Sequence, residues 1–113
     1  MVKIDSKYFV EVISDSMYDP ADRDSLIIGD RLEIDPELTP EDGDFVIVES
    51  GADMGVMKLI IRDGKHLLTW VNPARTGAIE VGGDTKIVGV VSMRCRYRLS
   101  DERWAAEMEV NHG

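Results

Sequence analysis

The sequence holds a single cysteine, Cys95, few basic residues and no long apolar run. One cysteine excludes an internal disulfide and fits a reducing compartment. The sequence has 22 acidic and 13 basic residues. The resulting formal charge of -9 argues against binding of this segment to the phosphate backbone of a nucleic acid. No run is long enough to span a bilayer, and residues 1–12 lack a secretory signal pattern, so we expect a cytoplasmic protein without a membrane partner.

The signatures of metal, phosphate and triad chemistry are also missing. His66, His112 and Cys95 stand apart along the chain, so no zinc-ligand spacing is present. Gly82-Gly83 lacks the following Lys-Ser/Thr of a phosphate-binding loop. A Ser-His-Asp triad would have to use His66, just after a hairpin turn, or His112, in a tail. Both are poor positions for a general base. From the missing zinc-ligand spacing and phosphate-binding loop, we expect no metal and no cofactor.

Short β-branched and aromatic runs, separated by turns, dominate the chain. A length of 113 residues allows one domain. Asp63-Gly64 lies between two apolar runs and is a strong hairpin signal. The runs of strand length are 8–13, 31–35, 45–49, 56–62, 66–71, 79–81 and 86–92. Turns at intervals of roughly ten residues predict an all-β sheet or barrel-like fold.

Three further segments complete the expected organisation. Residues 50–55, with two glycines, are expected to form a loop, and the basic residues 94–99 an edge strand that closes the sheet. Ser100 is placed to cap a short C-terminal helix reaching Val110. The chain is thereby divided into a lead-in, 1–8, one domain, 9–99, and a tail, 100–113.

Ser16 and Lys58 are the candidates for chemistry. Ser16 follows the end of a strand, where a nucleophile is both fixed and open to substrate. Lys58 is the only lysine inside an apolar run, on the same strand face as Val56 and Ile60. Burial would lower the pKa of this lysine and allow the neutral amine to act as a general base. The alternative is a turn serine and a lysine whose head reaches water.

The motifs around this pair occur in a specific order. They are Asp15-Ser16-Met17 with Pro20, Gly29-Asp30-x-x-x-x-Asp35-Pro36, Gly43-Asp44-Phe45-Val46, Lys58-Leu59, Asn72-Pro73 and Val88-Gly89-Val90-Val91. The series resembles the C-terminal domain of LexA and the lambda-type phage repressors, the self-cleaving serine–lysine peptidases. The resemblance covers about residues 9–97. The separation between the two candidates, 58 − 16 = 42, is also similar, and the long loop after Met17 is closer to the phage branch.

The resemblance implies a role for each residue of the candidate site. Ser16 would be the nucleophile and Lys58 its general base, while backbone N–H groups of Asp15 and Ser16 would stabilise the oxyanion. It implies a mainly antiparallel fold of curved sheets, LexA- and signal-peptidase-like, that forms a homodimer. Operator DNA would be bound only through an N-terminal helix-turn-helix domain absent here. The trigger would be the RecA filament on single-stranded DNA.

Two features depart from the family pattern. Ser14 stands where the family usually has glycine before the residue that precedes the serine. The family cuts its own chain at an upstream Ala-Gly or Cys-Gly bond, and neither pair occurs in this sequence. The residues before the first strand are also too few for a DNA-binding domain. We therefore expect a fragment that begins after the cleavage site, with a stand-alone relative as the alternative.

The resemblance implies the dimerisation and self-cleavage domain of a phage or prophage transcriptional repressor, acting in the SOS response to DNA damage. One alternative is a catalytically silent dimerisation domain of the same fold. Another is a translesion-polymerase accessory subunit, which shares the fold and the self-processing but not the DNA-binding domain. Signal peptidases use similar chemistry, but the sequence contains no membrane anchor.

Overall fold

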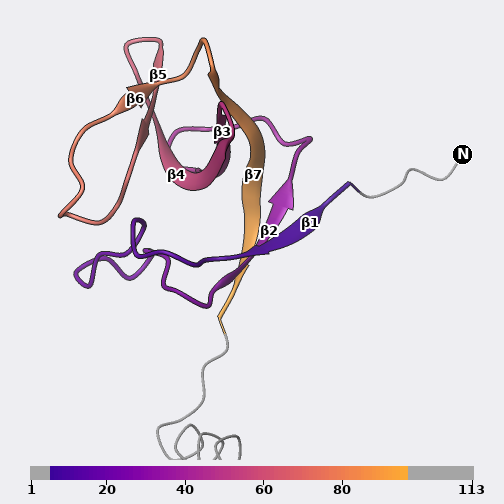
Figure 1. The fold of residues 1–113 in the computed structure, drawn as a ribbon, viewed down its shortest axis with the longest axis vertical. Helices are drawn as coiled ribbons and strands as arrows, with labels where there is room; N and C mark the ends of the chain where they lie inside the picture. Colours follow the sequence, from indigo (N-terminus) through magenta and orange to yellow (C-terminus); the bar gives the residue numbers. More distant parts are fainter. Residues whose placement is uncertain (1–5, 97–113) are drawn as a thin grey trace, which may run out of the picture.

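The computed structural model describes residues 6–96, which form one sheet of seven antiparallel strands and contain no helix (Figure 1). The strands are β1 (Tyr8–Glu11), β2 (Arg31–Asp35), β3 (Phe45–Ser50), β4 (Asp53–Arg62), β5 (Lys65–Thr69), β6 (Ile79–Glu80) and β7 (Thr85–Cys95). Their order in the sheet is β1-β2-β7-β3-β4-β5-β6. The predicted all-β fold, mainly antiparallel, is therefore confirmed.

The long strand β7 joins the two halves of the sheet, as the orange ribbon of Figure 1 shows. It pairs with β2 through residues 90–95 and with β3 through residues 85–90. Its pairing slips by one residue against each neighbour, between Glu33 and Ile34 on β2 and between Ile47 and Val48 on β3. Such bulges bend a strand and increase its twist. The slips thus help the sheet to curl, with β1 and β4 on opposite sides of β7.

Two hydrophobic clusters form the core. In the first, Val12 and Met17 pack with side chains of β2 and β3, including Ile34 and Ile47. The second joins Val46, Met57 and Leu68 with their neighbours on β3, β4, β5 and β7. Because side chains alternate along a strand, β3 contributes to both clusters from its two faces. The first cluster anchors the segment that follows β1, where Ser16 lies.

The strand boundaries correct two expectations. Residues 50–55 are not a loop, because β4 begins at Asp53 after a tight turn in which Gly51 has a φ of 60°. A turn this short leaves the first residues of β4 opposite the last residues of β3. Arg94 and Cys95 do not start a separate edge strand but form the end of β7, because the slip near Ser92 carries the β2 pairing onward. The predicted helix over 100–110 lies outside the described residues.

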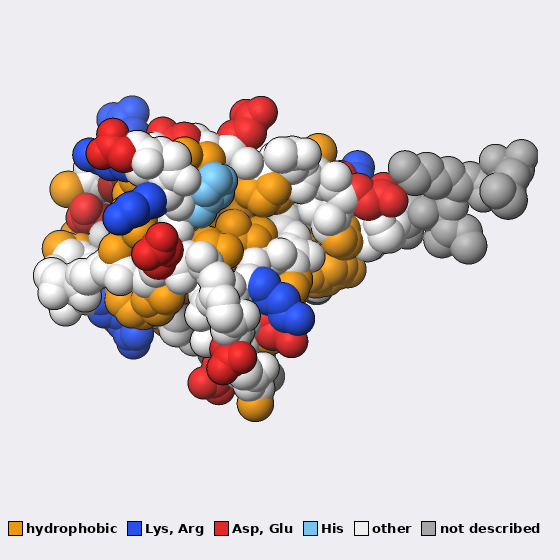
Figure 2. All heavy atoms as spheres, turned by 90° about the horizontal axis from the view of Figure 1, so that it is seen from above, with side chains coloured by type: hydrophobic (Ala, Val, Ile, Leu, Met, Phe, Trp, Pro, Cys, Tyr) orange, Lys and Arg blue, Asp and Glu red, His pale blue; other side chains and the backbone are white. Residues whose placement is uncertain are grey.

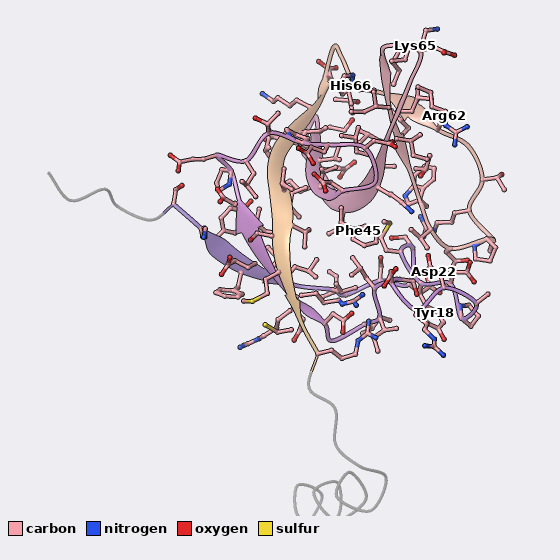
Figure 3. All side chains as sticks on the ribbon, turned by 180° about the vertical axis from the view of Figure 1, so that it is seen from behind. Tyr18, Asp22, Phe45, Arg62, Lys65 and His66 are labelled. Atoms are coloured by element: carbon pink, nitrogen blue, oxygen red, sulfur yellow. The ribbon has the colours of Figure 1, made fainter. Side chains whose placement is uncertain are left out.

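Hydrophobic and charged side chains share the face shown in Figure 2, where acidic and basic groups lie interspersed. At the opposite end from the loop with Tyr18 and Asp22, Figure 3 shows the hairpin that carries Arg62, Lys65 and His66. Ser16 lies just before the loop with Tyr18 and Asp22, so His66 is remote from Ser16. No helix in the part of the chain that the structure describes is long and apolar enough to cross a membrane.

Candidate functional site

The turn that carries Ser16 is held at both ends by buried side chains. Val12 and Met17 are 6% and 2% exposed, whereas Ile13 between them is 82% exposed. The N–H of Tyr18 donates to the carbonyl of Asp15 at 3.0 Å, which closes a four-residue turn around Ser16. On either side, Val12 exchanges backbone hydrogen bonds with residues 29 and 30, and the carbonyl of Met17 accepts one from the N–H of Leu26. Ser16 is therefore a half-buried residue at a fixed place in the chain.

A second segment, directly after β5, supports this turn from the other side. The carbonyl of Ser16 accepts hydrogen bonds from the N–H groups of Val71 and Asn72, at 3.2 and 3.0 Å. The amide nitrogen of Asn72 donates to the carbonyl of Asp15 at 2.9 Å, while its amide oxygen accepts from the N–H of Ala74. Asn72 thus positions the serine turn. The sequence offers Asn72-Pro73 as a motif but gives no reason to connect it with Ser16.

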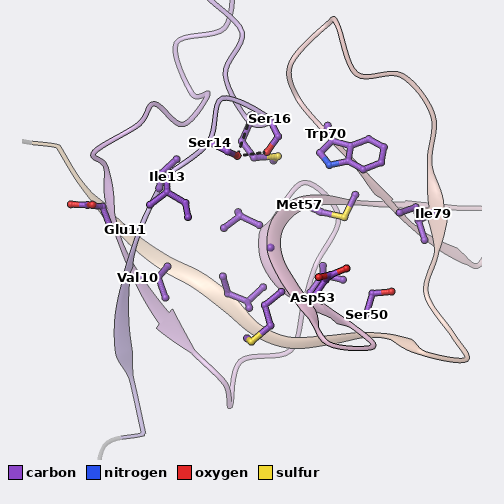
Figure 4. Close-up of a pocket in the computed structure, with 17 residues that line it drawn as sticks. Val10, Glu11, Ile13, Ser14, Ser16, Ser50, Asp53, Met57, Trp70 and Ile79 are labelled. Atoms are coloured by element: carbon purple, nitrogen blue, oxygen red, sulfur yellow. Dashed lines mark hydrogen bonds between the residues drawn. The ribbon is translucent and has the colours of Figure 1, made fainter.

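The hydroxyl of Ser16 contacts the hydroxyl of Ser14. The two oxygens lie 3.0 Å apart, and the N–H of Ser16 donates to the Ser14 hydroxyl oxygen over 3.4 Å. Figure 4 shows both side chains at one side of the pocket. The residue that departs from the family pattern is therefore the hydrogen-bond partner of the predicted nucleophile.

Ser16 lines an apolar groove of about 700 Å³. One wall consists of the end of β1 and the turn after it, and the other is the first half of β4, from Asp53 to Met57. Trp70 and Ile79 extend the lining on the β4 side (Figure 4). Its apolar walls suit a bound chain with hydrophobic side chains.

Both walls offer unpaired strand edges to such a chain. Among the described residues, β1 pairs only with β2, and β4 from Asp53 to Met57 pairs only with β3, since its pairing with β5 begins at Lys58. Free N–H and C=O groups on an exposed edge can bind an added strand.

Lys58 lies on a strand beside the segment that supports the serine turn, and no hydrogen bond joins it to Ser16. It is half-buried on β4, opposite Phe45 on β3 and Thr69 on β5. Thr69 is two residues before Val71, which contacts the serine turn. Within residues 6–96, the side chain of Lys58 has no hydrogen bond or ion pair, and the groove is lined by Met57 but not by Lys58. The structure thus brings the two predicted residues to neighbouring segments without joining them.

Three aspartates of the motif series serve the backbone of turns. A carboxylate oxygen of Asp35 accepts from the N–H of Glu37 at 2.9 Å, and one of Asp44 accepts from the N–H of Glu41 at 2.8 Å. Asp30 accepts from the N–H of Ile27 and binds the guanidinium of Arg96 through both oxygens, at 2.7 and 2.6 Å. These carboxylates are occupied by structural contacts.

Asp30 is more deeply buried than the other two aspartates, with 1% of its surface exposed. Burial alone raises its pKa, but the hydrogen bonds from Arg96 and Ile27 and the charges of Arg96 and Arg94 outweigh it. The pKa of Asp30 therefore lies below its usual value, and the carboxylate stays ionised. The pair fastens residues 25–30, and with them the serine turn, to the end of β7.

A scan against protein-family models and a search of curated proteins found no match to this chain.

Proposed function

We propose that this domain binds an extended segment of its own polypeptide in the groove beside Ser16 and cleaves it by serine–lysine chemistry. The observation that supports this most is the placement of Ser16 on one wall of an apolar groove that faces an unpaired strand edge. A chain added to that edge would present successive backbone carbonyls along the wall that carries Ser16. In keeping with the resemblance to LexA and the lambda-type repressors, the segment would be the linker to a DNA-binding domain.

In the proposed reaction, the neutral amine of Lys58 takes the hydroxyl proton as the oxygen of Ser16 attacks the carbonyl carbon. The C–N bond then breaks, the proton passes to the leaving amine, and water hydrolyses the resulting ester. Among the described residues, the amine of Lys58 has no hydrogen bond or ion pair that it would have to break first. A homodimeric repressor that is cut in response to a RecA filament is the setting we propose for this step.

The second candidate, a catalytically silent binding domain, is favoured by one observation. Among the described residues, no lysine, arginine or histidine lines the groove. Met57 of β4 lines it instead. Such a domain would hold the same segment in the same groove and leave it intact. A regulated binding module would result, with the fold retained and the serine without a base.

One labelling experiment separates the two candidates. A fluorophosphonate probe phosphorylates a serine whose proton is taken by a base, forming the O–P bond and releasing fluoride. We expect Ser16 to be labelled in the wild type at a pH between 7 and 10, with loss of about a hundredfold or more in Lys58→Ala. Peptide mapping by mass spectrometry identifies the modified residue, and Ser16→Ala is the blank.

Met57→Lys is the matched variant, because it places an amine in the groove itself. If Lys58 is the base, Met57→Lys changes the labelling rate of Ser16 little, and Ser16 stays unlabelled in Lys58→Ala. If Ser16 is unlabelled in the wild type and labelled only in Met57→Lys, Lys58 is not the base and the silent candidate is correct. Circular dichroism of each variant confirms that the sheet is intact before rates are compared.

A further inference from the structure

The side chain of Ser14 occupies the place where the oxygen of a substrate carbonyl would have to lie. Its hydroxyl oxygen is 3.0 Å from the hydroxyl oxygen of Ser16 and 3.4 Å from the backbone nitrogen of Ser16. A carbonyl poised for attack by Ser16, with that N–H as oxyanion donor, would make contacts with the same two atoms. The hydroxyl oxygen of Ser14 thus contacts both the nucleophile and the N–H that would donate to the oxyanion.

The contact with the N–H of Ser16 has the spacing of a turn contact, as in the bond from Glu37 to Asp35, but the serine turn has other bonds that hold it. Ser14 is exposed and lies in the segment between β1 and the serine turn, outside the buried clusters. The turn itself is already closed by the Asp15–Tyr18 hydrogen bond and by the two bonds from Val71 and Asn72 to Ser16. Loss of the Ser14 hydroxyl would leave all of these bonds in place.

We propose that Ser14 is an autoinhibitory residue, whose hydroxyl fills the oxyanion site in the resting domain and must rotate away before Ser16 reacts. This inference depends on the proposed peptidase function and adds a regulatory step to it. A substrate carbonyl that enters the groove displaces the Ser14 hydroxyl and takes over its hydrogen bond from the N–H of Ser16. The hydroxyl of Ser16 is released at the same moment and becomes available to Lys58.

The step has a consequence for which segments are cut. Displacement needs a carbonyl held firmly at one position, so a segment bound along the β4 edge opens the site while a small freely diffusing ester or amide does so less well. The domain would therefore discriminate against foreign substrates by the resting contact as well as by the shape of the groove.

The test compares Ser14→Gly and Ser14→Ala with the wild type in the fluorophosphonate reaction, because the P=O oxygen of that probe must enter the same oxyanion site. Both variants lack the blocking hydroxyl, and Ser14→Gly also has the residue usual in the family that the chain resembles. We expect labelling of Ser16 to be about two- to tenfold faster, the effect of one hydrogen bond that no longer has to be broken. The gain should be in the rate at saturating probe.

Ser92→Ala is the matched control. Ser92 is an exposed residue of β7 that does not line the groove, and its hydroxyl donates to a carboxylate oxygen of Glu33 at 2.8 Å. Its removal should leave the labelling rate unchanged. A gain in Ser92→Ala equal to that in Ser14→Ala would mean that loss of any exposed serine hydroxyl has this effect, and would overturn the proposal.

The outcomes distinguish this inference from the function on which it rests. Equal or slower labelling of Ser16 in both Ser14 variants, with a wild type that reacts, overturns the inhibitory role and leaves the peptidase function standing. A serine that no variant makes reactive between pH 7 and pH 10 overturns the peptidase function, and the inhibitory role with it. Labelling confined to the Ser14 variants supports both.

Discussion

At the scale of single residues, Asn72 connects two parts of the site that are far apart in the sequence. Its amide nitrogen donates to the carbonyl of Asp15, and its amide oxygen accepts from the N–H of Ala74. A side chain with a donor at one end and an acceptor at the other is required for this bridge. Aspartate has nearly the same shape but offers only acceptors when ionised.

Asn72→Asp is therefore expected to free the carbonyl of Asp15 while keeping the bond to Ala74. The new carboxylate also repels that carbonyl, so the turn around Ser16 should loosen and the free energy of unfolding should fall by about 1–2 kcal/mol. Hydrogen exchange of the Tyr18 amide, which closes the turn, should accelerate about tenfold. If Tyr18 in Asn72→Asp exchanges as slowly as in the wild type, the bond to Asp15 does not hold the turn.

At the scale of strands, Gly89 of β7 lies directly against the side chain of Ile34 on β2. A Cβ at this position would collide with Cγ2 of Ile34, a side chain with 0% exposure in the first cluster. The neighbour is a branched core residue with no free end to move, so the strand itself must shift. The motif Val88-Gly89-Val90-Val91 thus contains a glycine for reasons of packing.

Gly89→Ala should lower the free energy of unfolding by about 1–3 kcal/mol, the usual cost of an added methyl group in a filled core. Urea denaturation followed by circular dichroism measures the change. Gly55→Ala is the control within the same sheet, because a Cβ added there would meet no atom within 4 Å and its backbone lies outside the left-handed region. Equal losses in the two variants would show that the change of residue type, rather than the contact with Ile34, sets the cost.

The element boundaries also mark how far the sequence can be read. Alternation and turn residues are sufficient for the seven strands, because hydrophobic spacing is a local property. They do not reveal the start of β4 at Asp53, since Met54-Gly55 interrupts the apolar pattern and the strand is fixed there by its partner β3. The continuation of β7 through Arg94 is hidden as well, because a bulge resets the alternation of faces.

The candidate site is predictable only in part, for a related reason. Ser16 can be found because its position after a strand is visible locally. Its contacts with Ser14 and Asn72 depend on which rotamers and which distant segments meet, and neither follows from spacing. The expected approach of Lys58 to Ser16 stays a prediction, since the structure brings their segments together but places Met57 in the groove.

At the scale of the whole molecule, the pair of Asp30 and Arg96 ties the chain before β2 to the end of the last strand. The two residues are 66 positions apart, and the guanidinium also donates to the carbonyl of Ser25 at 3.0 Å. Asp30 is almost fully buried and Arg96 largely so. Removal of one partner would leave the other charge buried without compensation.

Asp30→Asn is therefore expected to lower the free energy of unfolding at pH 7 by about 3 kcal/mol. Because the pKa of Asp30 is lowered in the folded state, the unfolded chain takes up this proton first as the pH falls. The stabilisation is thus complete above the unfolded value of about 3.9 and is lost as the pH drops through the lower folded value. The difference between wild type and Asp30→Asn should accordingly shrink between pH 5 and pH 2.

Urea denaturation of both proteins across this range tests the expectation, and the difference between them cancels most of the titration of the other acidic residues. Asp24→Asn is the matched control, since it removes the same charge from an exposed side chain of the same loop and should change stability by less than about 0.5 kcal/mol. A constant difference between wild type and Asp30→Asn down to pH 2 would mean that the ionised carboxylate is not what holds the loop. In that case the hydrogen bonds from Arg96 and Ile27 to a protonated Asp30 would be sufficient to fasten the serine turn to the sheet.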